Sequence, residues 1–348
     1  MDVKEIAMPQ ADLFGDDLRL ISDRCADENL PGLQRLLEVY LPHSDEISRS
    51  LYTRLPVDDR PDFLAFLARR WAGFDLVPDS RLRAYDATIA EARAQPASAV
   101  TVAGQRYLRR NFAAQGADID LIGYEAALCV HTIGLDQYRH RDFSVAPGDI
   151  VIDGGAFIGD TAVYFHHVTG RQCQIHSFEL LSENAALFEA NRQLNRISSD
   201  EMVLNRLALS DRSGETMRIA NTSAPAAARA STNDAGEAIQ TISIDDYVES
   251  RNLDRVDVIK LDLEGGDVPA LAGARATIRR FRPKLALCLY HRWDDILAIP
   301  ALIHASGVDY RFVFKWVHLR AGWEAILMCT PVSPAIPSAE IDQSSLRD

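Results

Sequence analysis

The stretch VIDGGAFIGDTA, residues 151–162, constrains the fold more than any other part of this sequence. A short apolar run ends on Asp153, two glycines follow at once, and Gly159 precedes a helical pattern. Glycines in a turn between a strand and a helix leave the backbone uncovered, so that a ligand can approach it closely. The stretch therefore predicts a strand–turn–helix unit at the edge of a ligand-binding domain.

Strand and helix patterns alternate from residue 149 onward. We expect strands at 149–153, 173–178, 202–209, 256–261, 284–290, 310–317 and 324–329. We expect helices at 159–168, 183–195, 243–250, 269–281 and 294–305. Such alternation is typical of an α/β fold with a mostly parallel sheet and helices on both faces.

The chain divides into four regions by pattern and composition. Residues 1–98 show helical patterns broken at prolines, and residues 99–145 form an irregular connector that contains strands. The alternating pattern occupies residues 146–330. Residues 331–348 are rich in Pro and Ser, and we expect a disordered tail there. Residues 221–238, rich in Ala, Ser, Thr and Asn, are expected to form a mobile loop.

Composition excludes several classes of partner. The formal net charge of −13 argues against nonspecific binding to nucleic acid or to an anionic membrane surface. The five cysteines form no C-x-x-C pair, which fits reduced thiols in a cytoplasmic protein. No apolar run approaches the roughly 18 residues needed to span a bilayer, and the N-terminus lacks a secretory pattern. We expect a cytoplasmic protein without nucleic-acid or membrane partners.

The candidate cofactor-binding residues follow the ends of the expected strands, where parallel sheets bind ligands. Asp153 is expected to hold an ammonium group directly or through water. Glu179 comes 26 residues later at the end of the next strand, where a carboxylate can accept hydrogen bonds from two ribose hydroxyls. The full set is Asp153, Gly154, Gly155, Ala156, Phe157, Gly159, Asp160, Thr161, Glu179, Leu180, Ala208 and Leu209.

Two cofactors suit this pattern. A nicotinamide dinucleotide needs a G-x-G-x-x-G turn, and here Ala156 stands at the middle glycine position and would crowd a pyrophosphate. S-adenosylmethionine has no phosphate and carries an ammonium, a carboxylate and a sulfonium cation. Asp262 and Glu264, after the strand at 256–261, suit that cation or a hydroxyl nucleophile better than a hydride donor. An NAD(P)-dependent oxidoreductase and a non-catalytic nucleoside-binding module stay open as alternatives.

Six segments in order resemble the FkbM family of S-adenosylmethionine-dependent methyltransferases. They are DQYRHRDFSVAPGDIVIDGGAFIGDTAVYF, HSFELLSEN, LALSDRSGE, ISIDDYV, VIKLDLEGGDVPALAGA and YHRWDDILAIPALI. The resemblance covers roughly residues 136–318 and implies a class I methyltransferase fold, Rossmann-like, with a seven-stranded sheet whose last strand is antiparallel. It also implies methyl transfer, usually to an oxygen of a sugar or a natural product. Nothing carries over to the first 130 or so residues.

The expected reaction is an in-line displacement, aided by a general base if the acceptor is a hydroxyl. His291 follows the strand at 284–290 and is the first candidate for that base. Asp262 and Glu264 are candidates to position the acceptor or to orient His291, and His318 is a further catalytic candidate. A divalent ion held by Asp262 and Glu264 is the weaker alternative, because the spacing shows no third ligand, and we assign no metal site. The expected acceptor is a small molecule or a glycan, and the N-terminal helices are expected to influence acceptor choice or homodimer formation.

Overall fold

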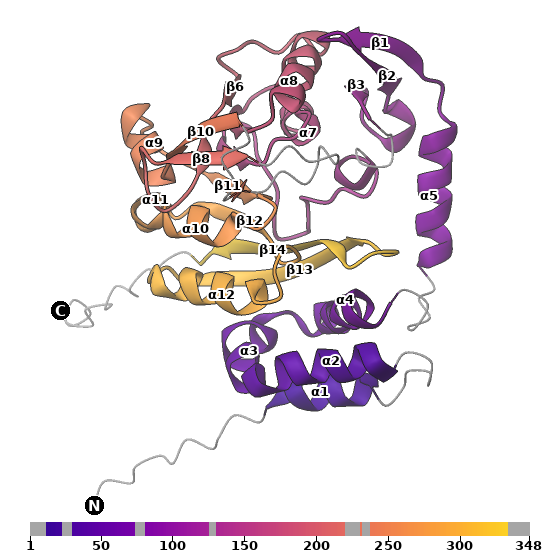
Figure 1. The fold of residues 1–348 in the computed structure, drawn as a ribbon, viewed down its shortest axis with the longest axis vertical. Coiled ribbons are helices and arrows are strands. Elements are labelled where there is room, and N and C mark those ends of the chain that lie inside the picture. Colours follow the sequence, from indigo (N-terminus) through magenta and orange to yellow (C-terminus); the bar gives the residue numbers. More distant parts are fainter. Residues whose placement is uncertain are drawn as a thin grey trace, which may run out of the picture.

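The computed structural model describes residues 12–22, 30–73, 81–124, 130–219, 230–231 and 237–332. Of residues 331–348, expected to be disordered, Pro331 ends a strand instead, and residues 333–348 lie outside the described residues. So do most of residues 221–238, expected to be a loop. Figure 1 shows a layered α/β arrangement with the helices of residues 13–72 gathered at one end.

A seven-stranded sheet forms the centre of the fold. Its strands are β4 (Ile150–Gly154), β5 (Gln174–Phe178), β6 (Met202–Asn205), β11 (Val258–Leu261), β12 (Lys284–Cys288), β13 (Tyr310–His318) and β14 (Trp323–Pro331). The order is β13-β14-β12-β11-β4-β5-β6, and only β14 is antiparallel to its neighbours. This confirms the predicted class I methyltransferase sheet. Strands β11 and β12 are buried almost throughout, which explains their continuous apolar sequence.

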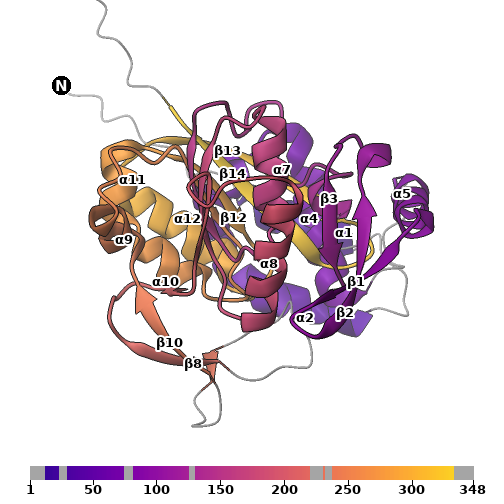
Figure 2. The same ribbon diagram turned by 90° about the horizontal axis from the view of Figure 1, so that it is seen from above.

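Helices cover both faces of this sheet. They are α7 (Asp160–Val168), α8 (Ser182–Leu194), α9 (Ile244–Ser250), α10 (Asp267–Ala272), α11 (Arg275–Phe281) and α12 (Asp295–Ala305). Figure 2 shows α7 and α8 on one side and α9 to α12 on the other. Ser243 caps α9 by accepting a hydrogen bond from the backbone of Asp246. The single helix expected over 269–281 is instead two, separated by Gly273 and Ala274.

The strand expected over residues 202–209 is wrong as one element. Strand β6 ends at Asn205, and β7 (Ala208–Leu209) pairs with β10 (Glu237–Ile242) in a second sheet. That sheet also contains β8 (Thr216–Ile219) and β9 (Ala230–Ser231). Arg206 lies between the two strands and donates to the Leu180 carbonyl and to Glu237. The chain therefore turns away from β5 at this point, a change that an apolar run alone does not reveal.

The N-terminal region is helical, as expected, and packs on the end of the central sheet. Its helices are α1 (Leu13–Ser22), α2 (Leu30–Tyr40), α3 (Ser44–Ser50), α4 (Arg60–Ala72) and α5 (Leu82–Ala94), with short 3₁₀ turns η2 (Leu41–His43), η3 (Tyr52–Arg54) and η4 (Val57–Asp59). The rings of Phe63 and Phe66 on α4 lie 5.2 and 5.8 Å from that of Phe314 on β13. These contacts join the region to the sheet through one continuous core.

A three-stranded antiparallel sheet connects the helices to the central sheet. It consists of β1 (Ser98–Val102), β2 (Gln105–Asn111) and β3 (Asp120–Gly123), with the 3₁₀ turn η5 (Ala113–Gln115) between the last two. Asn191 of α8 accepts a hydrogen bond from the backbone of Ile122 (2.7 Å) and donates to its carbonyl (2.9 Å).

No helix among the described residues is long and apolar enough to cross a membrane.

Candidate functional site

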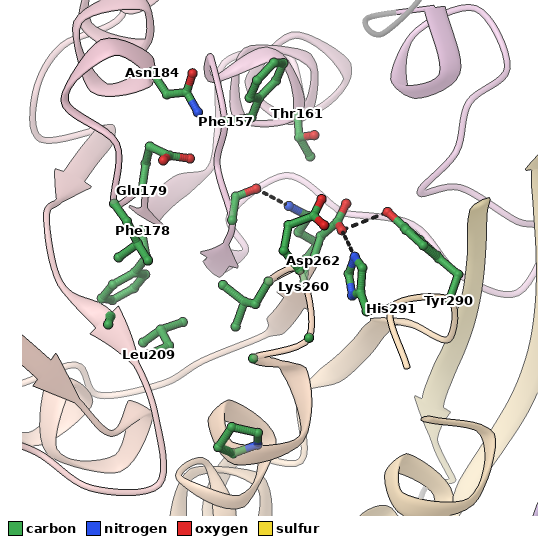
Figure 3. A pocket seen from close by; sticks show the side chains of 18 of the residues that line it. Phe157, Thr161, Phe178, Glu179, Asn184, Leu209, Lys260, Asp262, Tyr290 and His291 are labelled. Atoms are coloured by element: carbon green, nitrogen blue, oxygen red, sulfur yellow. Dashed lines mark hydrogen bonds and ion pairs between the residues drawn. The ribbon is translucent and has the colours of Figure 1, made fainter. Parts of the chain in front are cut away.

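A cavity of about 480 Å³ opens at the edge of the sheet where β4, β5, β11 and β12 end (Figure 3). One end, called here the loop end, is lined by Gly155, Phe157, Thr161 and Glu179. The other, called here the histidine end, is lined by Asp262, Tyr290, His291 and Glu324. Sequence-predicted residues on the wall are Gly155, Phe157, Asp160, Thr161, Glu179, Leu180, Ala208, Leu209, Asp262, Glu264 and His291.

The glycines of the loop allow close packing against neighbouring strand ends. Gly155 has φ +78°, and a methyl group on its Cα would lie 1.8 Å from the backbone oxygen of Asp262. Gly159 has φ +82°, and a methyl group there would lie 2.8 Å from the ring of Phe188. The backbone of Gly155 donates to the Phe178 carbonyl (3.0 Å). Only glycine satisfies both the left-handed backbone and the contact distance at these positions.

Asp153 lies behind the loop and is not on the cavity wall, in contrast to its expected contact with an ammonium group. Its side chain is 0% exposed and lies 3.1 Å from Nζ of Lys260. Lys260 also donates to the carbonyls of Gly154 (3.1 Å) and Gly155 (2.7 Å). Burial lowers the pKa of Lys260, but the carboxylates of Asp153 and Asp262 outweigh it and raise that pKa above its usual value.

The Asp153–Lys260 pair therefore holds the loop in place. Three other predicted cofactor residues are also absent from the cavity wall. They are packed against neighbouring side chains in the protein interior. They are Gly154, Ala156 and Gly159. The crowding argument based on Ala156 consequently does not apply to this cavity.

Glu179 provides a buried carboxyl group at the loop end. It follows β5, is 7% exposed, and its Oε1 accepts a hydrogen bond from the backbone of Leu181 (2.8 Å). Burial raises its pKa to about 7, although hydrogen bonds from the backbone of Leu181 and from Asn184 oppose the shift. A carboxylate at this place is able to accept two hydrogen bonds from a vicinal diol.

Asp262 is the centre of a hydrogen-bond network at the histidine end. It accepts hydrogen bonds from the hydroxyls of Tyr138 (3.0 Å) and Tyr290 (2.8 Å), and Nε2 of His291 lies 3.2 Å from Oδ1. Figure 3 shows Tyr290 and His291 converging on this carboxylate. Burial raises the pKa of Asp262, but the contact with His291 and the charge of Lys260 bring it below its usual range. The group is therefore a fixed carboxylate.

The surroundings of His291 do not suit the expected general base. Its side chain is 3% exposed and lies between two carboxylates, with Nδ1 2.7 Å from Asp267 and Nε2 3.2 Å from Asp262. Burial lowers the pKa of His291, but the neighbouring carboxylates of Asp262 and of Asp267, which is hydrogen-bonded to Nδ1, raise it to about 11. An imidazolium held this way has no lone pair for a proton. The structure therefore favours a fixed positive charge at His291.

The second acid beside His291 is Asp267, whereas Glu264 was the expected partner. Asp267 accepts hydrogen bonds from the backbones of Leu263 (3.1 Å) and Gly265 (3.2 Å), and so fixes the turn after β11. Glu264 lies on the cavity wall with φ +52°. Within the acidic run DLEGGD, Asp262 and Glu264 therefore line the cavity, and Asp267 stabilises the turn.

His318, a predicted catalytic residue, lies away from the cavity wall. Its ring centroid is 4.6 Å from that of His131, and its Nδ1 is 3.3 Å from the hydroxyl of Tyr85. The reason is its place at the end of β13, which extends towards the N-terminal helices. The structure does not bring His318 together with the other candidates.

Sequence reasoning missed several polar residues on the cavity wall, namely Thr132, Gln137, Tyr138, Asn184, Lys260, Tyr290 and Glu324. Tyr138 and Gln137 come from a segment before the first strand of the central sheet. Tyr290 was included in the expected strand 284–290, but β12 ends at Cys288. Glu324 stands at the start of β14. The signal in the sequence was an acidic residue directly before the apolar run of this strand.

Residues 153–320 match the family model described as the methyltransferase FkbM domain. This segment is an FkbM methyltransferase domain. The family depends on S-adenosylmethionine, so the predicted family and cofactor are confirmed. The match also favours methyl transfer over the NAD(P)-dependent alternative. No curated protein matches this sequence significantly.

Two solved structures illustrate the relationship. The crystal structure of the methyltransferase FkbM from Methylobacillus flagellatus KT is 19% identical, with a TM-score of 0.48 over 87% of this chain and 59% of that one. Aeropyrum pernix fibrillarin, in complex with natively bound S-adenosyl-L-methionine, is 10% identical, with a TM-score of 0.40 over 68% of this chain and 100% of that one. The chain thus spans 59% of the length of the Methylobacillus protein. Similarity at this level does not extend to substrates or site residues.

Proposed function

We propose that the FkbM domain methylates a hydroxyl group on a sugar, a glycan or a natural product. The observation that supports this is one cavity with two chemically different ends. A bare backbone and a buried carboxyl group form the loop end, and a cluster of carboxylates and phenols forms the histidine end. Such a cavity suits a nucleoside and a hydroxylated acceptor side by side.

The loop end fits S-adenosylmethionine on the chemistry of its residues. Glu179 is the residue to hold the ribose hydroxyls, because its carboxyl group is buried, lies on the wall and follows the strand next to the loop. Gly155 presents backbone without a side chain. When bound, S-adenosylmethionine supplies an activated methyl group on a sulfonium sulfur.

The histidine end fits a neutral acceptor rich in hydroxyl groups. The carboxylates of Asp262 and Glu264 stand on the wall beside the cations of Lys260, His291 and Arg292. Neither sign of charge dominates there, which suits a neutral acceptor. The phenols of Tyr138 and Tyr290 already point at Asp262, so they orient the carboxylate without consuming all of its lone pairs. Asp262 is therefore proposed to accept a hydrogen bond from the acceptor and to position it.

Calorimetry and methyl transfer test the proposal together. Purified protein should bind S-adenosylhomocysteine, and labelled methyl from S-adenosylmethionine should appear in the sugar or small-molecule fraction of a cell extract. Label found only on protein or nucleic acid would contradict the hydroxyl proposal. Binding of NADH without binding of S-adenosylhomocysteine would contradict the cofactor assignment as well.

We also propose a cytoplasmic location. Cys173, Cys288 and Cys329 are buried and free, which suits a reducing compartment. Fractionation of cells that express the full chain would check this, and recovery in a secreted or envelope fraction would contradict it.

A further inference from the structure

We propose that the carboxylate of Glu324 takes the proton from the acceptor hydroxyl during methyl transfer. This inference rests on the proposed function, because a proton has to leave only when the acceptor is a protic group such as a hydroxyl. Glu324 is a residue that neither the family match nor the sequence motifs assign.

The direction of β14 places Glu324 at the site. Parallel strands bring their last residues to the ligand edge of a sheet, whereas an antiparallel strand brings its first residues there. Strand β14 begins at Trp323 and is antiparallel to β12, and the backbone of Leu289 donates to the carbonyl of Ala325 (2.9 Å). Glu324 therefore lines the cavity beside the residues that follow β12.

The contacts of Glu324 are compatible with a protonated carboxyl group. Tyr290 has one hydroxyl proton, and its oxygen lies 2.8 Å from Oδ1 of Asp262 and 3.4 Å from Oε2 of Glu324. If that proton is donated to the fixed carboxylate of Asp262, the contact with Glu324 is a hydrogen bond only when Glu324 is protonated. The site thus accommodates both forms of the Glu324 carboxyl group.

One oxygen of Glu324 is left for a ligand. Gln137 donates a short hydrogen bond from Nε2 to Oε2, the oxygen that also contacts Tyr290. Within the described part of the chain, both hydrogen bonds to Glu324 end on Oε2. Oε1 is consequently the oxygen that can face an acceptor hydroxyl in the cavity.

Three other titratable groups on the wall suit the role less well. Asp262 is a carboxylate fixed by three neighbours, and His291 is an imidazolium between two acids. Glu179 lies beyond β5, four strand positions from β14, or roughly 19 Å at a strand spacing of about 4.8 Å. That separation assigns Glu179 to the loop end and Glu324 to the histidine end.

The electrostatic surroundings agree with this role. Burial and the charge of Asp262 raise the pKa of Glu324 to about 8, while Gln137, His291 and Tyr290 oppose the shift. A general base works best when its pKa is close to the working pH. Groups that face Glu324 from the surrounding elements are Asp262, His291, Tyr290, Tyr138, Tyr85 and Cys288.

The proposed step conserves atoms and charge. The acceptor oxygen forms a bond to the methyl carbon, and the carbon–sulfur bond breaks with its electron pair going to the sulfonium sulfur. The hydroxyl proton moves to Oε1 of Glu324, which becomes a neutral carboxylic acid. The proton then passes to solvent when the products leave.

Infrared difference spectroscopy tests the proton-holding state without an acceptor. Spectra of the full chain with bound S-adenosylhomocysteine, between about pH 6 and about pH 10, should show a carboxylic acid band that is lost near pH 8. Glu324→Gln should remove that band. The matched control Glu249→Gln, on the exposed surface of α9, should keep it. A spectrum unchanged by Glu324→Gln over this range would overturn the proposal.

Methyl transfer supplies the second readout. The acceptors are a panel of methyl glycosides, phenols and amines, with labelled S-adenosylmethionine as the methyl donor. For the hydroxyl acceptors, Glu324→Gln should lower the rate by about 100-fold or more and leave S-adenosylhomocysteine affinity unchanged. The wild-type rate should fall as the pH falls below about 8, and the variant should lose this dependence. A variant with the wild-type rate would overturn the role of Glu324 alone. Wild-type transfer to amines but not to hydroxyls would overturn the proposed function instead.

Discussion

The two ends of the cavity are built in different ways. The loop end relies on backbone and on residues that follow consecutive strands, such as Gly155 and Glu179. The histidine end joins side chains that are far apart in the sequence, because Asp262 contacts Tyr138, 124 positions away, and Tyr290, 28 positions away. The loop end should therefore respond to changes in backbone geometry, and the histidine end to changes in distant side chains.

Lys260 joins the two ends, so its removal gives the largest expected effect. Lys260→Met leaves Asp153 buried without its cation, and we expect the free energy of unfolding to fall by about 3–5 kcal/mol. Chemical denaturation measures this change. In the double variant Asp153→Asn with Lys260→Met the unpaired charge is gone, and stability should recover in part.

A surface ion pair provides the control for Lys260. Arg35 lies 3.6 Å from Glu38 with both side chains about two-thirds exposed, at 66% and 68%. Arg35→Met should cost less than about 1 kcal/mol. If the double variant at positions 153 and 260 is no more stable than Lys260→Met, lost packing and not the unpaired charge explains the effect.

Gly155→Ala tests the backbone of the loop end. The new methyl group would meet the Asp262 backbone oxygen, and the residue would keep a left-handed φ, so we expect a loss of roughly 2–4 kcal/mol and weaker S-adenosylhomocysteine binding. Gly214 has a similar φ of +80° with no atom within 4 Å of such a methyl group. Gly214→Ala should therefore cost about 1 kcal/mol, from backbone strain alone. Equal losses in the two variants would show that the close contact is unimportant.

Glu179→Gln tests the side chain of the loop end. A neutral amide replaces the carboxylate proposed to accept two hydrogen bonds from the ribose. We therefore expect S-adenosylhomocysteine to bind about 10- to 100-fold more weakly, equivalent to about 1.5–3 kcal/mol. Calorimetry measures this, with Glu189→Gln on the outer side of α8 as the control. Affinity unchanged by Glu179→Gln would remove this residue from the cofactor site.

The stability of the free protein gives a second test of Glu179. Its pKa is raised from 4.5 to about 7 in the folded chain, so the folded state binds the proton more tightly than the unfolded state does. This stabilisation is present below about pH 4.5 and is lost as the pH rises to about 7. Glu179→Gln should flatten that part of the curve of unfolding free energy against pH. An unchanged curve would mean that the Glu179 carboxyl is not desolvated.

The same contrast explains what the sequence could predict. Strand β4, the glycine turn and Glu179 form one local pattern, and the structure places them as a class I methyltransferase sheet requires. At Asp153 and His291 the surroundings differ from the expected ones because tertiary contacts govern them. The sequence shows an acid at Asp153, but not that Lys260, its partner on the neighbouring strand β11, pairs with it behind the loop. Likewise it shows His291, but not that Asp267 faces its second nitrogen.

Glu324 was missed for a different physical reason. Candidate site residues were expected just after the carboxyl ends of strands, where ligands bind to parallel sheets. Strand β14 is antiparallel, so its beginning lies at that edge. The family resemblance had implied an antiparallel last strand, and applying the rule in reverse to that strand would have indicated Trp323, Glu324 and Ala325.

Tyr40→Phe gives the smallest expected effect and tests whether the N-terminal helices support the histidine end. The Tyr40 hydroxyl donates to the Trp293 carbonyl (3.0 Å), two residues after His291. Its loss should cost about 1 kcal/mol of unfolding free energy, lower the methyl-transfer rate and leave S-adenosylhomocysteine affinity unchanged. Tyr52→Phe removes a similar hydrogen bond, to Asp17 (2.7 Å), within the same helices. If both variants lower the rate equally, the helices act through overall stability and not through the segment that carries His291.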